Sequence, residues 1–404
     1  MTAFRRLGLG VIDQALSSLS NVLFLVAVAR VSGVEEFGAV SFGYALFAFG
    51  LSVQRSSIGL LVSLSARRNL PPPALLALLW ALVVVALGLA LGATVGDGGS
   101  AAYYVVVAGC LVVYPQDILR YNAIAQRRAG HAVLSDAIWT SATVALVLAS
   151  LAGVSMDTTT MVLVWVGAGC VALVAIALAE QVAVASSPRR WFADHADELR
   201  ILGPDAVLAS LAPLLLAATM AEFMTLGDVA AVRGAGTLLG PTAVLFAALP
   251  AVILPEMARI LGDDRARLAR VQAFVMGLLV VAWGGFLLLV PDDVGVHVLG
   301  ETWTRSIAVL PYAVLELVMW ALAAGPISLL SAYRRWRTLL LARVAYMAMV
   351  TCALAVTIAS DSVVRVMIGM AVASAGNCLV LAIAARGLSR DHVAVGGAPD
   401  SSST

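Results

Sequence analysis

Long apolar segments alternate with short polar gaps along this chain of 404 residues. A helix that crosses a bilayer needs about 20 predominantly apolar residues, and most of these segments reach that length. The strands of a membrane barrel are shorter and alternate in polarity, so the pattern predicts helices. We expect about twelve membrane-crossing helices, over residues 8–29, 37–63, 73–95, 101–119, 132–153, 160–183, 201–222, 230–257, 271–290, 306–331, 338–358 and 364–385.

Composition agrees with lipid as the surroundings of most of the chain. Hydrophobic residues make up 61% of the sequence and charged residues 12%. A water-soluble fold of this size would then have too little polar surface to cover its core. The predicted fold class is an all-α integral membrane protein without a sizeable soluble domain.

The longest gap lies near the middle of the chain and separates six predicted helices from six. The second and eighth helices end alike, at Ala66-Arg67 and Ala258-Arg259. An even number of crossings per half gives both halves the same orientation, which indicates a parallel repeat. We therefore expect an N-terminal six-helix lobe (1–183), a cytoplasmic linker (184–200), a C-terminal six-helix lobe (201–386) and a disordered cytoplasmic tail (387–404).

The basic residues, which are all arginine, orient these helices. Nineteen of the 25 fall in every second gap, and only Arg30, Arg305 and Arg365 fall in the other gaps. Positive charge favours the cytoplasmic side, so both termini are expected in the cytoplasm and the protein in the cytoplasmic (inner) membrane. The nineteen are Arg5, Arg6, Arg67, Arg68, Arg120, Arg127, Arg128, Arg189, Arg190, Arg200, Arg259, Arg265, Arg267, Arg270, Arg334, Arg335, Arg337, Arg386 and Arg390.

The first apolar segment carries polar residues that argue for a retained helix. Its start and the Ala27-Val28-Ala29 sequence resemble a cleaved signal peptide, but Asp13, Gln14 and Asn21 interrupt the apolar run. Asp13 and Asn21 share one helical face, which we expect to point away from lipid. Asn21 is a candidate substrate-binding residue and Asp13 a candidate ion-coupling residue, although a structural role for Asp13, by pairing or capping near the inner surface, is slightly favoured.

Three arginines remain within the predicted helices, and Arg55 is the deep one with polar neighbours. It lies beside Gln54, and both are candidate substrate-binding residues. Charged groups at this depth usually face a cavity or a partner, so Arg55 either contacts substrate or forms a structural pair, for instance with Asp13. Arg233 is a further substrate-binding candidate, and it can also reach the headgroups from its position near the outer surface, as Arg343 can near the inner one.

Glu316 is the deepest carboxylate of the chain. It either titrates as an ion-coupling site or accepts a structural hydrogen bond, and both readings stay open. Structural roles suffice for Asp136 and Glu180, which lie nearer the cytoplasmic side. Asp117 and Arg120 are three residues apart, which predicts a local surface pair of small energetic value.

Sequence signals for catalysis and metal binding are weak. The four histidines and four cysteines are isolated, and the sequence contains no lysine for a phosphate-binding P-loop. The arginines are dispersed and form no basic stripe, so we expect no nucleic-acid partner. The chain is predicted to be neither an enzyme nor a protein with a cofactor or metal.

Two stretches carry a resemblance to a known family. The first is Ala29-Arg30-Val31-Ser32-Gly33-Val34-Glu35-Glu36-Phe37-Gly38, together with the preceding Asp13–Asn21 segment. The second runs from Gly240-Pro241 to Leu254-Pro255-Glu256-Met257-Ala258-Arg259. Both resemble the polysaccharide export proteins and Wzx-like oligosaccharide flippases of the multidrug/oligosaccharidyl-lipid/polysaccharide (MOP) superfamily.

This resemblance implies two six-helix lobes around a central cavity. It further implies flipping of a polyprenyl-pyrophosphate-linked saccharide, as in lipopolysaccharide O-antigen assembly, with cationic side chains that hold the anionic headgroup. Arg55 suits that role because a guanidinium binds phosphate oxygens in a bidentate manner. The implied partners are the lipid-linked saccharide, membrane lipids, and glycosyltransferases or a polymerase of the same pathway.

Two alternatives remain. One is a multidrug or cation antiporter of the same superfamily, for which we would expect a cavity lined by carboxylates. The other is a scaffold that transports nothing and organises a cell-envelope assembly complex, for which we would expect long partner-binding loops.

Overall fold

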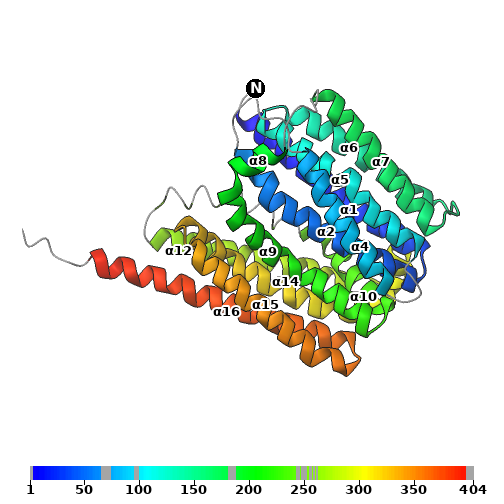
Figure 1. Ribbon diagram of the computed structural model, residues 1–404. Coiled ribbons are helices and arrows are strands. Elements are labelled where there is room, and N and C mark those ends of the chain that lie inside the picture. The colour runs from blue at the N-terminus through cyan, green and yellow to red at the C-terminus, as the bar shows by residue number, and fades with distance from the viewer. Residues whose placement is uncertain are drawn as a thin grey trace, which may run out of the picture. The chain divides into compact units, whose positions relative to one another are not determined.

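The computed structural model describes residues 3–64, 74–94, 100–180, 188–242 and 263–396, with isolated positions 246, 253, 257 and 260. The described residues form helices joined by short turns, without any strand, and Figure 1 shows these helices as long rods. The predicted all-α fold class is therefore confirmed.

The helices follow one another with short connections. In chain order they are α1 (Ala3–Val31), α2 (Val34–Gln54), the π-helix η1 (Arg55–Gly59), α3 (Leu60–Leu64), α4 (Ala74–Thr94), α5 (Ala101–Ala125), α6 (Ala129–Leu151), α7 (Thr158–Ala179), α8 (Pro188–Asp194), α9 (Ala196–Phe223), α10 (Leu226–Leu238), α12 (Asp263–Leu288), α13 (Asp292–Leu299), α14 (Thr302–Ala332), α15 (Trp336–Thr357), the 3₁₀-helix η2 (Ile358–Ser360) and α16 (Val363–Gly396).

Ten helices in the described part of the chain are long and apolar enough to cross a membrane. α1 contributes a shorter apolar stretch, Leu16–Val31. The predicted eighth crossing begins with α10 and then continues into residues of which only a few are described. Ten of the twelve predicted crossings thus reappear at the expected places along the chain.

Two helices continue past their predicted ends. α5 runs on to Ala125 instead of residue 119, because the charges at its end are buried and paired. α16 runs on to Gly396 and so includes residues 387–396, which were expected to be disordered. Nothing in that stretch breaks a helix until Gly396-Gly397 and Pro399. Residues 397–404 lie outside the described part.

The chain forms two compact units. The first comprises Met1–Gly240 with Val290–Ala308, and the second comprises Pro241–Leu289 with Val309–Thr404. These units are defined by contacts, whereas the lobes predicted from the sequence repeat are defined by topology. The proposed lobe, linker and tail boundaries therefore stay a prediction.

Aromatic packing joins α1, α2, α6 and α7 within the first unit. The rings of Phe24 and Trp165 stack with centroids 4.2 Å apart, and Phe47 meets Trp165 edge-on. The indole nitrogen of Trp139 donates a hydrogen bond of 3.0 Å to the carbonyl oxygen of Trp165. Contacts between buried aromatic rings therefore join these four helices.

The second unit packs mainly through aliphatic side chains. Met276 and Val280 of α12 form a buried cluster with Ala321 of α14. A second cluster joins Leu330, at the end of α14, to α15 and α16. Small residues in these clusters let the helices approach closely, as is common in lipid.

The sequence around Gly33 and Gly38 packs the start of α2 against the start of α10. Gly38 lies against the backbone of Leu226, where a Cβ atom would overlap the carbonyl oxygen. The carboxylate of Glu35 accepts a hydrogen bond of 3.0 Å from the backbone N–H of Gly227. The residues that carried the family resemblance therefore join α2 to α10.

Capping side chains define where several helices begin. Asp157 caps α7 by accepting a hydrogen bond of 2.9 Å from the backbone N–H of Thr160, and this bond lowers the pKa of its carboxyl group. Thr225 and Asp228 form a reciprocal capping box at the start of α10. Both caps satisfy backbone donors that have no partner inside the helix.

The two glycines of the α2 segment provide a matched test of this packing. We expect Gly38→Ala to destabilise the protein by about 1–3 kcal/mol, because the added methyl group overpacks the contact with α10. An added Cβ at Gly33 meets nothing within 4 Å, so Gly33→Ala should leave stability nearly unchanged. Thermal unfolding of both variants in detergent measures the difference, and equal melting temperatures would contradict the packing role of Gly38.

Candidate functional site

A π-helical segment interrupts the second membrane-crossing helix. η1 spans Arg55–Gly59 and joins α2 to α3 without a break. Short π-helical segments inside α-helices are frequent at functional sites. Arg55, the main substrate-binding candidate, is the first residue of this segment.

Arg55 binds Asp117 of α5 with one edge of its guanidinium group. Its Nε atom lies 3.1 Å from each carboxylate oxygen, and its Nη2 atom lies 2.6 Å from Oδ1. The Asp117 side chain is 1% exposed, whereas the Arg55 side chain is 24% exposed. Arg55 thus has a fixed edge on a buried carboxylate and a partly accessible side chain.

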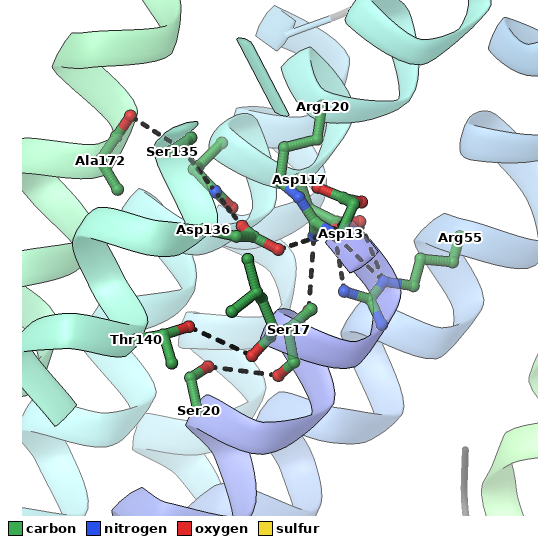
Figure 2. Close-up of polar contacts among 12 residues, drawn as sticks. Asp13, Ser17, Ser20, Arg55, Asp117, Arg120, Ser135, Asp136, Thr140 and Ala172 are labelled. Atoms are coloured by element: carbon green, nitrogen blue, oxygen red, sulfur yellow. Dashed lines mark hydrogen bonds and ion pairs between the residues drawn. The ribbon is translucent and has the colours of Figure 1, made fainter. Parts of the chain in front are cut away.

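Arg120 lies one helical turn beyond Asp117 and binds three carboxylates. Its guanidinium nitrogens lie 2.8 Å from Asp117, 2.6 Å from Asp13 of α1 and 2.8 Å from Asp136 of α6. All four side chains are almost completely buried. Figure 2 shows this arrangement with Arg120 between the aspartates and Arg55 on the other side of Asp117. We call Asp13, Arg55, Asp117, Arg120 and Asp136 the ionic cluster.

Neutral polar groups surround the ionic cluster. Gln116 donates hydrogen bonds to Ser135 at 2.9 Å and to Asp136 at 3.1 Å. Ser135 donates in turn to the backbone of α7, and Thr140 donates to the backbone of α1. The cluster is therefore built into the contacts of four helices.

The charges of the ionic cluster do not cancel. Three aspartates face two arginines, which leaves one negative charge when all five groups are ionised. Opposite charges that are paired in this way compensate one another in a low-dielectric interior, where burying a single unpaired charge would cost much free energy. No group of three or more His, Cys, Asp or Glu within the described residues is arranged to hold a metal ion.

This geometry corrects three expectations from the sequence. Arg55 does form an ion pair, but with Asp117 and not with Asp13, which binds Arg120 instead. Asp117 and Arg120 do pair, but they are buried and not at the surface. Arg120 was counted among the loop arginines, although it lies inside α5.

The sequence contained a signal for the buried pair. Apolar residues continue after Asp117 and Arg120, at Ile118, Leu119 and Ala123, and all three are buried. A helix that ended at residue 119 would leave these side chains without a core to pack in. The prediction ended the helix at residue 119 because Gln116 and Asp117 are polar. The groups that pair with them lie on distant segments of the chain and are not visible in the local sequence.

The remaining candidates in the first unit are dispersed. Gln54 is fully buried and donates a hydrogen bond of 3.0 Å to the carbonyl oxygen of Tyr114. Asn21 is partly exposed on α1, one turn beyond Ser17. The side chain of Gln14 lies outside the described residues.

Arg233 lies on α10, two turns from the start of that helix. Its guanidinium carbon is 4.3 Å from the ring centroid of Tyr44, a residue of α2. Tyr44 is also within electrostatic range of Arg55. Two of the predicted substrate-binding arginines thus lie near one buried tyrosine.

Glu316 belongs to the second unit, and it is described there by itself. It lies on α14, is half-buried, and faces Ser374 of α16. Tyr346 of α15 is also close to its carboxyl group. These hydroxyl neighbours suit either a titrating carboxyl group or a hydrogen-bonded one, so the role of Glu316 stays a prediction.

Similarity to known proteins is found in three dimensions only. No protein-family model matches the sequence, and no curated protein matches it. The inward-facing conformation of a multidrug resistance MATE family transporter of the MOP superfamily is similar over 94% of this chain and 98% of its own, with a TM-score of 0.66 and 15% identity.

Two further solved structures share the fold. The lipid II flippase MurJ in its inward closed conformation matches 93% of this chain and 87% of its own, with a TM-score of 0.67 and 11% identity. A MOP superfamily transporter from Pyrococcus furiosus Vc1 (DSM3638) matches 94% and 93%, with a TM-score of 0.53 and 15% identity. The chain therefore has the fold of MOP superfamily transporters.

Two Asp–Arg pairs, each with partners three positions apart in the chain, test how much the ionic cluster stabilises the protein: Asp117–Arg120 is buried and Asp197–Arg200 is exposed. Arg120→Leu should destabilise the protein by about 3–5 kcal/mol, because it leaves buried carboxylates without a cation. Arg200 pairs with Asp197 at 3.1 Å, but the two side chains are 78% and 92% exposed. Arg200→Leu should therefore change stability by less than about 1 kcal/mol.

Thermal unfolding of the two variants, together with their yield in the membrane fraction, checks this contrast. Equal stability of Arg120→Leu and Arg200→Leu would show that the cluster does not hold the helices together. Asp13→Asn is a milder companion variant, since it removes one charge and keeps the shape.

Proposed function

We propose that this chain, which has the fold of the MOP superfamily transporters, flips an anionic lipid-linked saccharide across the cytoplasmic membrane by alternating access. The single observation that carries this proposal is the position of Arg55. It is an arginine at membrane depth whose side chain is partly accessible and whose guanidinium group is held at one edge by a buried carboxylate.

The contact with Asp117 prepares Arg55 for an anion. A guanidinium has five N–H donors, and the bonds to Asp117 use only those on Nε and Nη2. The two N–H groups of Nη1 and the second N–H of Nη2 remain, and their directions are set because the fork is planar and held at one edge. A phosphate oxygen can then bind without first ordering the side chain, which lowers the entropy lost on binding.

Arg233 supports a second contact with the same kind of substrate. It stacks on Tyr44, which also feels the charge of Arg55. A diphosphate group carries negative charge on two phosphates, so two cations can bind it, and an arginine can bind each phosphate in a bidentate manner. In this proposal the saccharide is supplied by glycosyltransferases of the same pathway.

A multidrug or cation antiporter is the second candidate, and the ionic cluster favours it in one respect. Its carboxylates outnumber its arginines, and cation exporters need negative charge. However, those carboxylates are buried against Arg120, whereas the exposed group is Arg55. The Pyrococcus furiosus neighbour is described as having a binding pocket of reverse polarity that suggests a different function, so the sign of an accessible charge is a sensible guide within this fold.

Arg55 variants test the proposal directly. Arg55→Ala and Arg55→Glu should lower the flipping of a fluorescent polyprenyl-pyrophosphate-linked saccharide in proteoliposomes at least about tenfold, the effect of losing about 1.4 kcal/mol of headgroup binding. Arg55→Lys should retain part of the activity, since it keeps the charge and loses the fork.

A double variant separates a substrate contact from a purely structural pair. Arg55→Ala leaves Asp117 with one cation fewer, whereas Arg55→Ala with Asp117→Asn removes both members of the pair. If the double variant regained full transport, Arg55 would serve only to balance Asp117. Full activity of Arg55→Glu in a well-folded protein would also overturn the proposal.

Glu316→Gln tests ion coupling in the second unit. We expect transport by this variant to lose its dependence on a proton or sodium gradient, because an amide cannot titrate. Flipping rates measured with and without an imposed gradient give the answer. An unchanged dependence would make Glu316 a structural hydrogen-bond acceptor, and it would leave the role of Arg55 untouched.

A further inference from the structure

A groove of about 500 Å³ lies within the first unit, apart from the ionic cluster. One wall is α4, with Leu79, Trp80 and Val83. The opposite wall is formed by α8 and α9, and the floor is the end of α2 with η1. We call this space the α4–α9 groove.

The groove offers hydrocarbon surface and few free polar groups. Its floor includes Gln54 and Ser57. Gln54 donates to the backbone of Tyr114 and Ser57 donates to the carbonyl oxygen of Val53, so the buried amide oxygen of Gln54 is the one atom of these two side chains without a partner among the described residues. Trp80 donates its indole N–H to the carbonyl oxygen of Gly50. A polar ligand would therefore gain little in the groove, whereas an alkyl chain would fill it well.

The surroundings of the groove identify a lipid as its occupant. Leu79, Val83 and Phe192 line it and are also largely exposed, so its open side is the side that faces lipid tails. α8 also lines the groove, and its exposed Arg189 and Arg190 are a basic pair of the kind found at membrane surfaces. The groove thus lies at hydrocarbon depth, next to an interfacial helix.

The charge around α8 suits an anionic headgroup. Arg189 and Arg190 are exposed on this helix, and Arg200 of α9 lines the groove itself with a side chain that is 78% exposed. Basic residues at this depth attract the anionic lipids of the leaflet that they face. One anionic phospholipid can therefore place an acyl chain in the groove and its phosphate near these arginines.

From these observations we infer that the α4–α9 groove binds one acyl chain of an anionic phospholipid from the bilayer. The chain packs on Ser57 and Ile58, two residues of η1, and so supports the π-helical segment that begins with Arg55. This site is separate from the substrate contact proposed above, because it requires neither Arg55 nor a saccharide.

Photolabelling of the full chain tests this inference. The protein is placed in bilayers of phosphatidylethanolamine and phosphatidylglycerol that include a phosphatidylglycerol with a diazirine near the end of one acyl chain. After irradiation, mass spectrometry of the peptides should find the label concentrated in residues 74–83 and 191–203. Even labelling of all lipid-facing helices, α12 included, would overturn the inference.

Two glycines offer a matched pair of variants. Gly203 lines the groove and Gly167 lies on α7, and at each an added Cβ meets nothing within 4 Å. Gly203→Phe should fill the groove and lower the labelling of these segments about tenfold, equivalent to about 1.4 kcal/mol. Gly167→Phe should leave the labelling unchanged, and equal labelling of both variants would count against the site.

A stability measurement gives a second readout. Phosphatidylglycerol added to the protein in detergent should raise its melting temperature, since a ligand of the folded state stabilises it. The rise should persist in Gly167→Phe and disappear in Gly203→Phe. If an equimolar polyprenyl phosphate displaced the labelled phospholipid from the groove, the occupant would be an isoprenoid chain and the inference would be wrong.

Discussion

The first unit depends on one buried cation, the guanidinium group of Arg120. It binds carboxylates from α1, α5 and α6 at 2.6–2.8 Å, and Asp117 extends the contact to Arg55 in η1. In a hydrocarbon environment an unpaired charge is far less favourable than a paired one. Each helix that carries one of these carboxylates is therefore held in place by electrostatics, whereas packing alone would allow small displacements.

The same constraint makes the proposed transport site possible. An arginine at membrane depth would by itself be costly and disordered, since its side chain has several rotatable bonds. Asp117 fixes one edge of Arg55 and is itself neutralised in part by Arg120. The protein can thus keep an arginine with a partly accessible side chain at this depth without leaving its charge uncompensated.

Helix positions could be read from the sequence because lipid imposes a simple rule of length and polarity. That rule failed where charges were buried in pairs. Residue 119 seemed to end a helix because Gln116, Asp117 and Arg120 follow an apolar run, yet α5 continues to Ala125. The depth of Arg55 was predictable, but its partner was not. Asp117 is 62 residues away in the chain, and only the packing of α2 on α5 brings the two together.

The groups that recognise distant partners were the hardest to predict for the same reason. Asp13 was expected near the inner surface in a structural role, and it does pair, but with Arg120 instead of Arg55. The Gly33–Gly38 segment was useful as a mark of resemblance before its contact was known. Gly38 lies where α10 approaches α2 too closely for a Cβ atom, and a local sequence pattern does not reveal that contact.

The π-helical segment also changes the phase of the helix that contains it. A π turn holds more residues than an α turn, so residues beyond η1 are rotated by about 100°, one residue of α-helical rotation, from where a regular helix would place them. Before η1, Gly43 and Gly50 turn toward Tyr103 and Tyr114 of α5. After it, Leu61 and Val62 pack against Trp191 of α8 as well as Tyr121 of α5. One membrane-crossing helix thereby presents two differently oriented faces, and the residue at the junction is the arginine on which the proposed transport depends.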